Sequence, residues 1–297
     1  MRLIVTCLIA AQSISLATAL RAQDKPARIS VVEGFSIPVA AVYDARRNAY
    51  LVSSVNGVAD VADNNGFISV VSADGKMKSR KWIEGGKEGV VLDGPKGIAL
   101  SGNTIWIADI TVVRAFDRRD GAPIRTIKVP GSRFLNGLAV GPDGSLYITD
   151  TGLQFSGPQP KHVGPDRVYR VGPKGEVSIV VESGELSAPT GIAWNRTTSE
   201  VLVVGLNGRI IQAVSPDKSR LRAVTSGPGE YDGLEAFGPN EFLVASQTGA
   251  VLRLHGKSLL PFIPGLGTLG GIAADRSRKR VLVTLLNDDK VELWQYH

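Results

Sequence analysis

Gly137-Leu138-Ala139 is one copy of a phrase that recurs along this 297-residue chain: a small residue, an apolar residue and usually Ala. The other copies are Gly97-Ile98-Ala99, Gly191-Ile192-Ala193, Gly233-Leu234-Glu235 and Gly271-Ile272-Ala273, with a weaker one at Ala40-Ala41-Val42. Successive copies begin 38 to 57 residues apart. A period of that size, with several short strands in each unit, is typical of the blades of a β-propeller. We therefore predict an all-β fold, a six-bladed β-propeller with four-stranded blades.

The third repeat shows the plan of a blade most clearly. We expect strands over 138–140, 145–149, 167–171 and 177–181. Gly141-Pro142-Asp143-Gly144 supplies turn chemistry between the first two of them. The sixth repeat supplies only three strands before the sequence stops. We therefore predict that a strand over 28–32 completes the last blade and closes the ring, which would cover an edge strand.

The first residues have the features of an export signal. Arg2 is followed by an apolar run, and small residues up to Ala22 suit cleavage. Gln12 and Ser13 interrupt the run below the ~18 apolar residues that a membrane span needs. We expect a signal peptide over 1–22 and a single propeller domain over 23–297, periplasmic or secreted, with no membrane span in the mature chain. The only cysteine, Cys7, lies inside the signal, so the mature domain has no disulfide or cysteine-based site.

Charge and loop patterns add two further expectations. The chain carries 34 basic and 28 acidic residues, and basic ones gather in turns such as Arg46-Arg47 and 276–280. We interpret these turns as solvated, and because no stacking aromatic residues accompany them we expect no nucleic-acid partner. Two long loops, 60–66 and 151–166, are candidate lids on the ligand face. His162 in the second is interpreted as a solvated loop residue.

Two positions in each blade are expected to face one central opening. The first precedes the small residue of the repeat and the second ends the next strand, because antiparallel neighbours meet at the same end. The first set is Val39, Lys96, Asn136, Thr190, Asp232 and Gly270, and the second is Ser54, Asp109, Asp150, Gly205, Ser246 and Leu285. The candidate ligand-binding residues among them are Lys96, Asp109, Asp150 and Thr190. The structural alternative is that an Asp or Asn at a strand end caps a loop.

A family resemblance accompanies these positions. The stretches 134–139, 143–150, 188–194 and 231–234 resemble the gluconolactonase, regucalcin and senescence-marker family, and the likeness spans nearly the whole chain beyond the signal. The resemblance implies a divalent cation, often calcium, that polarises a lactone carbonyl and activates water. It implies Asn136 and Asp232 as metal ligands, with Asp232 also the catalytic base. The family's Glu and its second Asn fall on Val39 and Thr190, which depart from the pattern.

The sequence leaves two functions open. One is an exported gluconolactonase-like protein that binds a small polar ligand at the channel mouth and, if it is an enzyme, hydrolyses a lactone or ester with Ca²⁺ or another divalent cation. The other is a non-catalytic propeller that binds a ligand or a protein partner. The polar opening favours the first, whereas Val39 and Thr190 favour the second. A further possibility is that Lys96 reaches across the channel toward Asp232 and fills the place of a metal.

Overall fold

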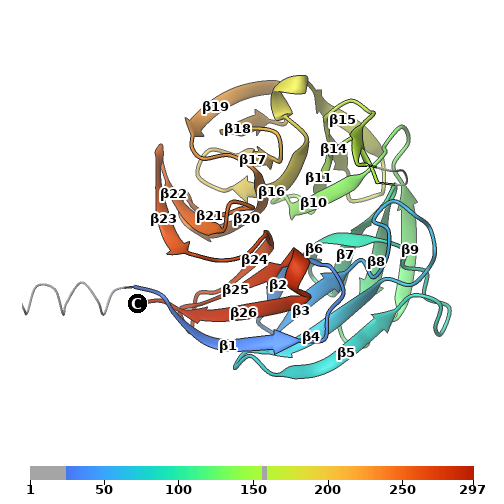
Figure 1. Ribbon diagram of the computed structural model, residues 1–297. Coiled ribbons are helices and arrows are strands. Elements are labelled where there is room, and N and C mark those ends of the chain that lie inside the picture. The colour runs from blue at the N-terminus through green and yellow to red at the C-terminus, as the bar shows by residue number, and fades with distance from the viewer. Residues whose placement is uncertain (1–24, 156–158) are drawn as a thin grey trace, which may run out of the picture.

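The computed structural model describes residues 25–155 and 159–297, so the expected signal segment 1–22 lies outside it. Within these ranges, six four-stranded antiparallel sheets stand around a common axis (Figure 1). This arrangement confirms the predicted six-bladed propeller. None of the helical segments in the same ranges is long and apolar enough to cross a membrane.

Each blade is a meander whose first strand lies nearest the axis. Blade one is β2 (Pro38–Asp44), β3 (Ala49–Ser54), β4 (Phe67–Ser72) and β5 (Met77–Glu84). Blade two is β6 (Pro95–Ser101), β7 (Thr104–Asp109), β8 (Val112–Asp117) and β9 (Pro123–Lys128). Blade three is β10 (Leu135–Val140), β11 (Leu146–Asp150), β14 (Arg167–Val171) and β15 (Val177–Glu182).

The second half of the ring repeats this plan. Blade four is β16 (Pro189–Asn195), β17 (Glu200–Gly205), β18 (Ile210–Ser215) and β19 (Arg220–Ser226). Blade five is β20 (Tyr231–Gly238), β21 (Glu241–Ser246), β22 (Ala250–His255) and β23 (Ser258–Pro264). Blade six is β24 (Leu269–Asp275), β25 (Arg280–Leu285), β26 (Lys290–Gln295) and β1 (Ala27–Glu33). A small hairpin, β12 (Leu153–Gln154) with β13 (Lys161–His162), and two 3₁₀ turns, η1 (Gly184–Leu186) and η2 (Leu286–Asp288), complete the described elements.

The ring closes through the two ends of the domain. Strand β1 pairs antiparallel with β26, with Ala27 opposite Gln295 and Glu33 opposite Lys290. In Figure 1 the blue β1 lies beside the red β26. The predicted strand over 28–32 is therefore confirmed as the fourth strand of the last blade. It covers the edge that the C-terminal strand would otherwise expose.

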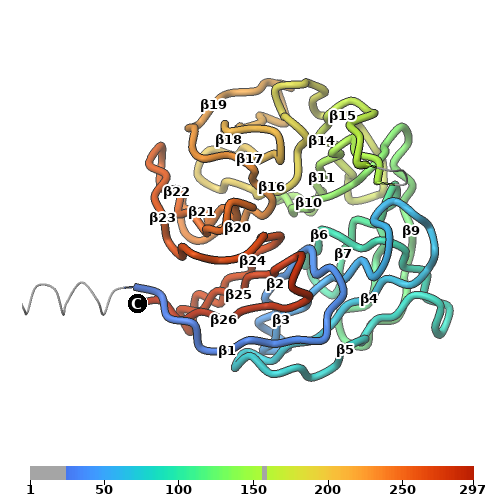
Figure 2. Tube along the Cα trace, in the orientation of Figure 1, coloured from blue at the N-terminus to red at the C-terminus, as the bar shows by residue number. Residues whose placement is uncertain are grey.

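The repeated glycine is required by the contact between neighbouring inner strands. A Cβ built on Gly137 would lie 2.2 Å from the carbonyl oxygen of Thr190, and one on Gly191 would lie 2.5 Å from that of Asp232. Such separations are far inside van der Waals contact, so only glycine lets the backbones approach this closely. Neighbouring inner strands therefore contact one another all the way around the axis and form a continuous wall. In Figure 2 these strands, β2, β6, β10, β16, β20 and β24, lie around a common centre.

Each inner strand also carries a β-bulge at its start. In blade five, Tyr231 pairs with Ser246 but Leu234 pairs with Val244, so the inner strand has one extra residue. The first two strands of the other five blades show the same kind of register shift. A bulge changes the face to which the following side chains point. It thus decides which residues reach the axis.

The core lies between the blades. Buried apolar clusters span successive blade pairs, as where Phe116 of blade two packs with Leu51 and Ile68 of blade one. Buried hydroxyls add polar links: Thr149 Oγ1 accepts from the Gly137 amide at 2.8 Å and donates to the Thr190 carbonyl of the next blade at 2.5 Å. Blades are therefore held to one another by both apolar packing and hydrogen bonds, which keeps the inner strands in fixed positions.

Candidate functional site

A channel of about 490 Å³ runs along the propeller axis, walled by the inner strands. All six inner strands run in the same direction, so the channel has two chemically different ends. We call the end where they begin the first mouth; Val39, Asn136 and Asp232 line it. We call the other end the second mouth; Tyr43, Arg118, Trp194, Arg196 and Arg276 line it. Between the two, small and aliphatic side chains form the wall.

Asn136 and Asp232 occupy equivalent positions of blades three and five, and both line this channel. The Asn136 side chain is 9% exposed, and its Nδ2 lies 3.3 Å from Thr151 Oγ1, to which it donates. Asp232 Oδ2 accepts from Gln247 Nε2 at 3.0 Å. Burial raises the pKa of Asp232 to about 6, against the opposing effect of that hydrogen bond. An amide and a weakly acidic carboxylate from separate blades thus share one opening.

Thr190 and Lys96, expected at the same mouth, point elsewhere. The Thr190 hydroxyl is fully buried, and its single proton is shared between the carbonyl oxygens of Tyr231 at 2.9 Å and Val204 at 3.3 Å. Lys96 is 1% exposed, and its Nζ donates to the Gly94 oxygen at 2.6 Å and the Ala59 oxygen at 3.1 Å.

The Lys96 ammonium also lies 4.2 Å from the centre of the Phe134 ring. Burial lowers the pKa of Lys96 to about 8. The possible approach of Lys96 to Asp232 across the channel is therefore wrong, because loop carbonyls and an aromatic face hold the ammonium away from the axis.

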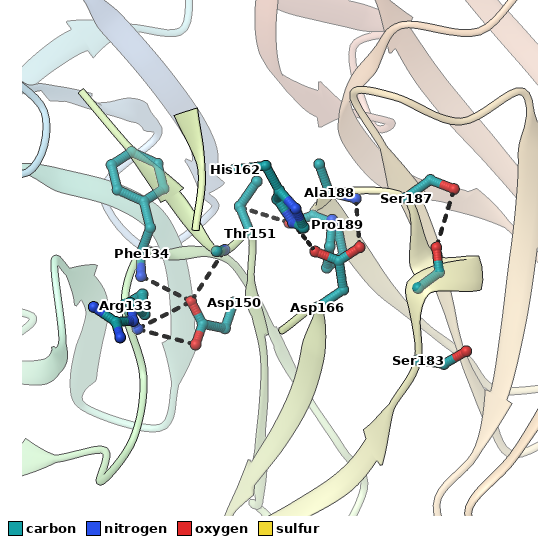
Figure 3. Close-up of polar contacts among 12 residues, drawn as sticks. Arg133, Phe134, Asp150, Thr151, His162, Asp166, Ser183, Ser187, Ala188 and Pro189 are labelled. Atoms are coloured by element: carbon teal, nitrogen blue, oxygen red, sulfur yellow. Dashed lines mark hydrogen bonds and ion pairs between the residues drawn. The ribbon is translucent and has the colours of Figure 1, made fainter. Parts of the chain in front are cut away.

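Asp109 and Asp150 lie under loops rather than on the channel. Asp150 accepts from the amides of Phe134 at 2.7 Å and Arg133 at 3.0 Å (Figure 3). Asp109 accepts from the Gly94 amide at 2.6 Å and forms an ion pair with Arg114. Both carboxylates are buried and hold the loop that leads into the inner strand of their own blade. The geometry is that of the loop-capping alternative.

The two long loops meet at the first-mouth end of the molecule. The Phe155 amide donates to Asp60 Oδ2 at 2.8 Å, and the Phe155 ring lies 5.1 Å from that of Phe134. His162 Nε2 lies 2.6 Å from Asp166 Oδ1, and Asp166 Oδ2 accepts from the Ala188 amide at 2.9 Å (Figure 3). His162 is thus anchored to blade three, although its side chain stays 43% exposed.

The donor set at the first mouth does not fit a resident divalent cation. It comprises one carboxylate and one amide, from Asp232 and Asn136, with the isopropyl group of Val39 beside them. Thr190 is fully buried, hydrogen-bonded to the Tyr231 carbonyl, and does not line the channel. Across the described ranges, no three His, Cys, Asp or Glu side chains group so that they could hold a metal ion. Calcium takes six to eight oxygen ligands, several of them charged, so these residues leave its charge poorly compensated.

Sequence reasoning missed Glu235, which also lines the channel. Burial raises the pKa of Glu235 to about 7, opposed by a hydrogen bond from the Ala274 amide and by the nearby charge of Arg276. The sequence does contain an indication of this residue, because Glu235 replaces the Ala found in most copies of the repeat. Arg276 was expected only in a solvated basic turn, and Arg196 was not singled out. Both residues directly follow inner strands and line the channel.

Comparison with known proteins identifies the fold. No family model and no curated protein matches the chain. Among solved structures, a structural-genomics target assigned as a gluconolactonase aligns with a TM-score of 0.68 and 17% identity, covering 92% of each chain. A gluconolactonase of Xanthomonas campestris aligns with a TM-score of 0.65 and 18% identity, covering 91% of this chain and 92% of its own.

A third solved structure has a different biological setting. A nidogen/laminin complex aligns with a TM-score of 0.64 and 17% identity over 80% of this chain and 84% of the other. Identities this low show a shared fold and nothing about activity. The expected likeness to gluconolactonases is therefore confirmed at the level of the fold, and the same fold also occurs in a protein–protein complex.

Proposed function

We propose that this propeller, which shares its fold with gluconolactonases, binds a small polar molecule at the first mouth of its channel. The observation that carries the proposal is that Asn136 and Asp232, from separate blades, line one channel of about 490 Å³. Small-molecule sites are concave, of this size and mostly apolar, with a few convergent polar groups. The ligand would hydrogen-bond to the amide and the carboxylate and place its apolar surface against the wall. Export of the chain, expected from its N-terminal segment, would give it a ligand outside the cytoplasm.

The raised pKa of Asp232 favours a hydrolytic role for this site. A carboxyl group with a pKa of about 6 is mostly ionised at neutral pH, yet basic enough to take a proton from water. In this scheme Asp232 removes a proton as the water oxygen bonds to a lactone or ester carbonyl. The Asn136 amide can donate to the oxyanion that forms. The acyl C–O bond then breaks, and the proton on Asp232 passes to the leaving oxygen. No step passes through a metal, because the donor set does not fit one.

The experiment compares wild type with Asp232→Asn, Asn136→Ala and the matched control Asp217→Asn. Asp217 lies exposed in a turn of blade four, away from the channel. Hydrolysis of a panel of lactones and aryl esters is measured after chelator treatment. Removal of a general base is expected to lower turnover about 10²–10⁴-fold, with Asp217→Asn unchanged.

Binding measurements separate catalysis from simple recognition. Calorimetric titration with the corresponding hydroxy acids is expected to show binding that Asn136→Ala weakens by about tenfold. Binding without turnover would assign the protein to the alternative class, a non-catalytic ligand-binding module. Turnover and binding that are both unaffected by Asp232→Asn and Asn136→Ala would refute the first mouth as the site.

A further inference from the structure

Three arginines converge on the second mouth of the channel. Arg196 directly follows the inner strand β16, Arg276 follows β24, and Arg118 follows β8 of blade two. They come from blades two, four and six, so they are spread around the axis rather than along one edge. Their side chains line the same channel as Asn136 and Asp232 but lie at its opposite end.

The charges of these arginines are unequally compensated. Arg118 donates from Nε and Nη2 to the two carboxylate oxygens of Asp44, at 3.0 and 2.6 Å. Neither Arg196 nor Arg276 forms a side-chain ion pair within residues 25–155 and 159–297, and both are exposed. The carboxyl group of Glu235 lies deeper in the channel and provides an opposing charge near Arg276. Two guanidinium groups are thus available to a ligand.

An aromatic surface stands beside these cations. Trp194, two residues before Arg196, lines the channel and is stacked on Tyr147, with ring centres 5.4 Å apart at 28°. Tyr43 also lines the second mouth, where its hydroxyl accepts from Arg278 Nη1 at 2.8 Å. The two rings are therefore held in place before any ligand arrives. Aromatic rings in fixed positions can pack against a planar or cyclic molecule, and guanidinium groups can donate two parallel hydrogen bonds to its carboxylate or phosphate.

We propose that the second mouth is a separate binding site for a small organic anion. Its carboxylate or phosphate group would sit between Arg196 and Arg276, and its organic part would lie against Trp194 and the aliphatic wall. The site does not depend on Asp232 or on hydrolysis at the first mouth. It gives the channel two chemically distinct entrances, one offering an amide and a carboxylate and the other guanidinium groups.

The test is a titration with two probes, inorganic phosphate and benzoate, at constant ionic strength and pH 8. Binding is followed by calorimetry and by tryptophan fluorescence. Arg196→Gln and Arg276→Gln are each expected to weaken binding about tenfold or more, since hydrogen bonds to charged groups are lost. Arg220→Gln is the matched control, because Arg220 is an exposed arginine that begins β19 at the same end of the propeller but does not line the channel.

Further variants locate the probe and separate this site from the first mouth. Glu235→Gln removes the opposing charge and is expected to tighten binding about threefold or more. Trp194→Phe should abolish the benzoate-dependent fluorescence change while phosphate binding persists. Asp232→Asn should leave both affinities unchanged, so a failure of the proposed hydrolysis leaves this result intact.

Three outcomes would overturn the anion site. They are dissociation constants weaker than about 10 mM for both probes, an equal loss in Arg196→Gln and Arg220→Gln, and loss of anion binding in Asp232→Asn. Saturable phosphate binding without benzoate binding would assign the site to phosphate groups. Saturable benzoate binding without phosphate binding would assign the site to carboxylates that carry an aromatic or cyclic group.

Discussion

Asp232 and Glu235 lie three residues apart on β20, and both line the central channel. On a regular strand, side chains three residues apart point to opposite faces of the sheet. The bulge between Tyr231 and Leu234 adds one residue and brings the two acids to the same lumen. Blade five therefore contributes two carboxyl groups to the channel, one toward each mouth, and both are desolvated by the surrounding wall.

These two acids should make the stability of the fold depend on pH. Burial raises the pKa of Asp232 from 3.8 to about 6, and that of Glu235 from 4.5 to about 7. The folded state then binds more protons than the unfolded state between about pH 4 and 7, so stability falls as pH rises through that window. The loss becomes complete about one pH unit above the folded pKa of Glu235, at about pH 8, and it is small at about pH 4.

The measurement is urea unfolding of wild type, Asp232→Asn and Glu235→Gln from pH 4 to 8. Each amide variant is expected to be about 1–3 kcal/mol more stable than wild type at pH 8 and equal to it near pH 4. Asp217→Asn serves as the control at an exposed turn outside the channel. A difference between variant and wild type that stays constant with pH would show that the two acids are not desolvated in the fold.

Gly137→Ala should disrupt the ring of inner strands. The added methyl would lie 2.2 Å from the carbonyl oxygen of Thr190, which is a backbone atom and cannot move aside as the end of a flexible side chain could. We expect a loss of at least about 3 kcal/mol in the free energy of unfolding. Gly184→Ala is the matched control, because a Cβ there meets nothing within 4 Å. Equal stability of the two variants would contradict the close packing of blades three and four.

Asp150→Ala should loosen the approach to the inner strand of blade three. It removes the acceptor of the Phe134 and Arg133 amides and leaves at least one of them buried without a partner. A loss of about 2–4 kcal/mol is expected, with Asp150→Asn intermediate because one side-chain oxygen remains. Thermal and urea unfolding measure the effect. If Asp150→Ala were as stable as wild type, the loop-capping role would be contradicted and Asp150 would again be a candidate ligand-binding residue.

Lys96→Met should free the loop of blade one without affecting the channel. The substitution keeps much of the side-chain volume but removes the hydrogen bonds to Ala59 and Gly94. Replacing a buried charge by an apolar residue is often close to neutral for global stability. We therefore expect at least tenfold faster amide exchange around Ala59 and a change of less than about 2 kcal/mol in unfolding. Ligand binding at Asn136 and Asp232 should persist; its loss would place Lys96 in the binding site.

The sequence predicted the architecture well because each blade is encoded by one copy of a sequence repeat, and the repeat can be recognised without coordinates. Close contact between inner strands requires glycine at the same point of most blades, as at Gly137 and Gly191, and that requirement is visible without coordinates. Closure by the strand beginning at Ala27 followed from counting strands in the last repeat. The positions of Asn136 and Asp232 on the channel followed from the same period.

The direction of each side chain was decided by tertiary structure. Lys96 and Asp150 hold periodic positions in their blades, yet loop carbonyls and loop amides turn them away from the axis. Glu235 reaches the axis because a bulge shifts its strand by one residue. A sequence records spacing, which sets where a residue lies along a blade. It does not record which buried partner a polar group must find once water is removed, and that requirement fixed where each side chain points.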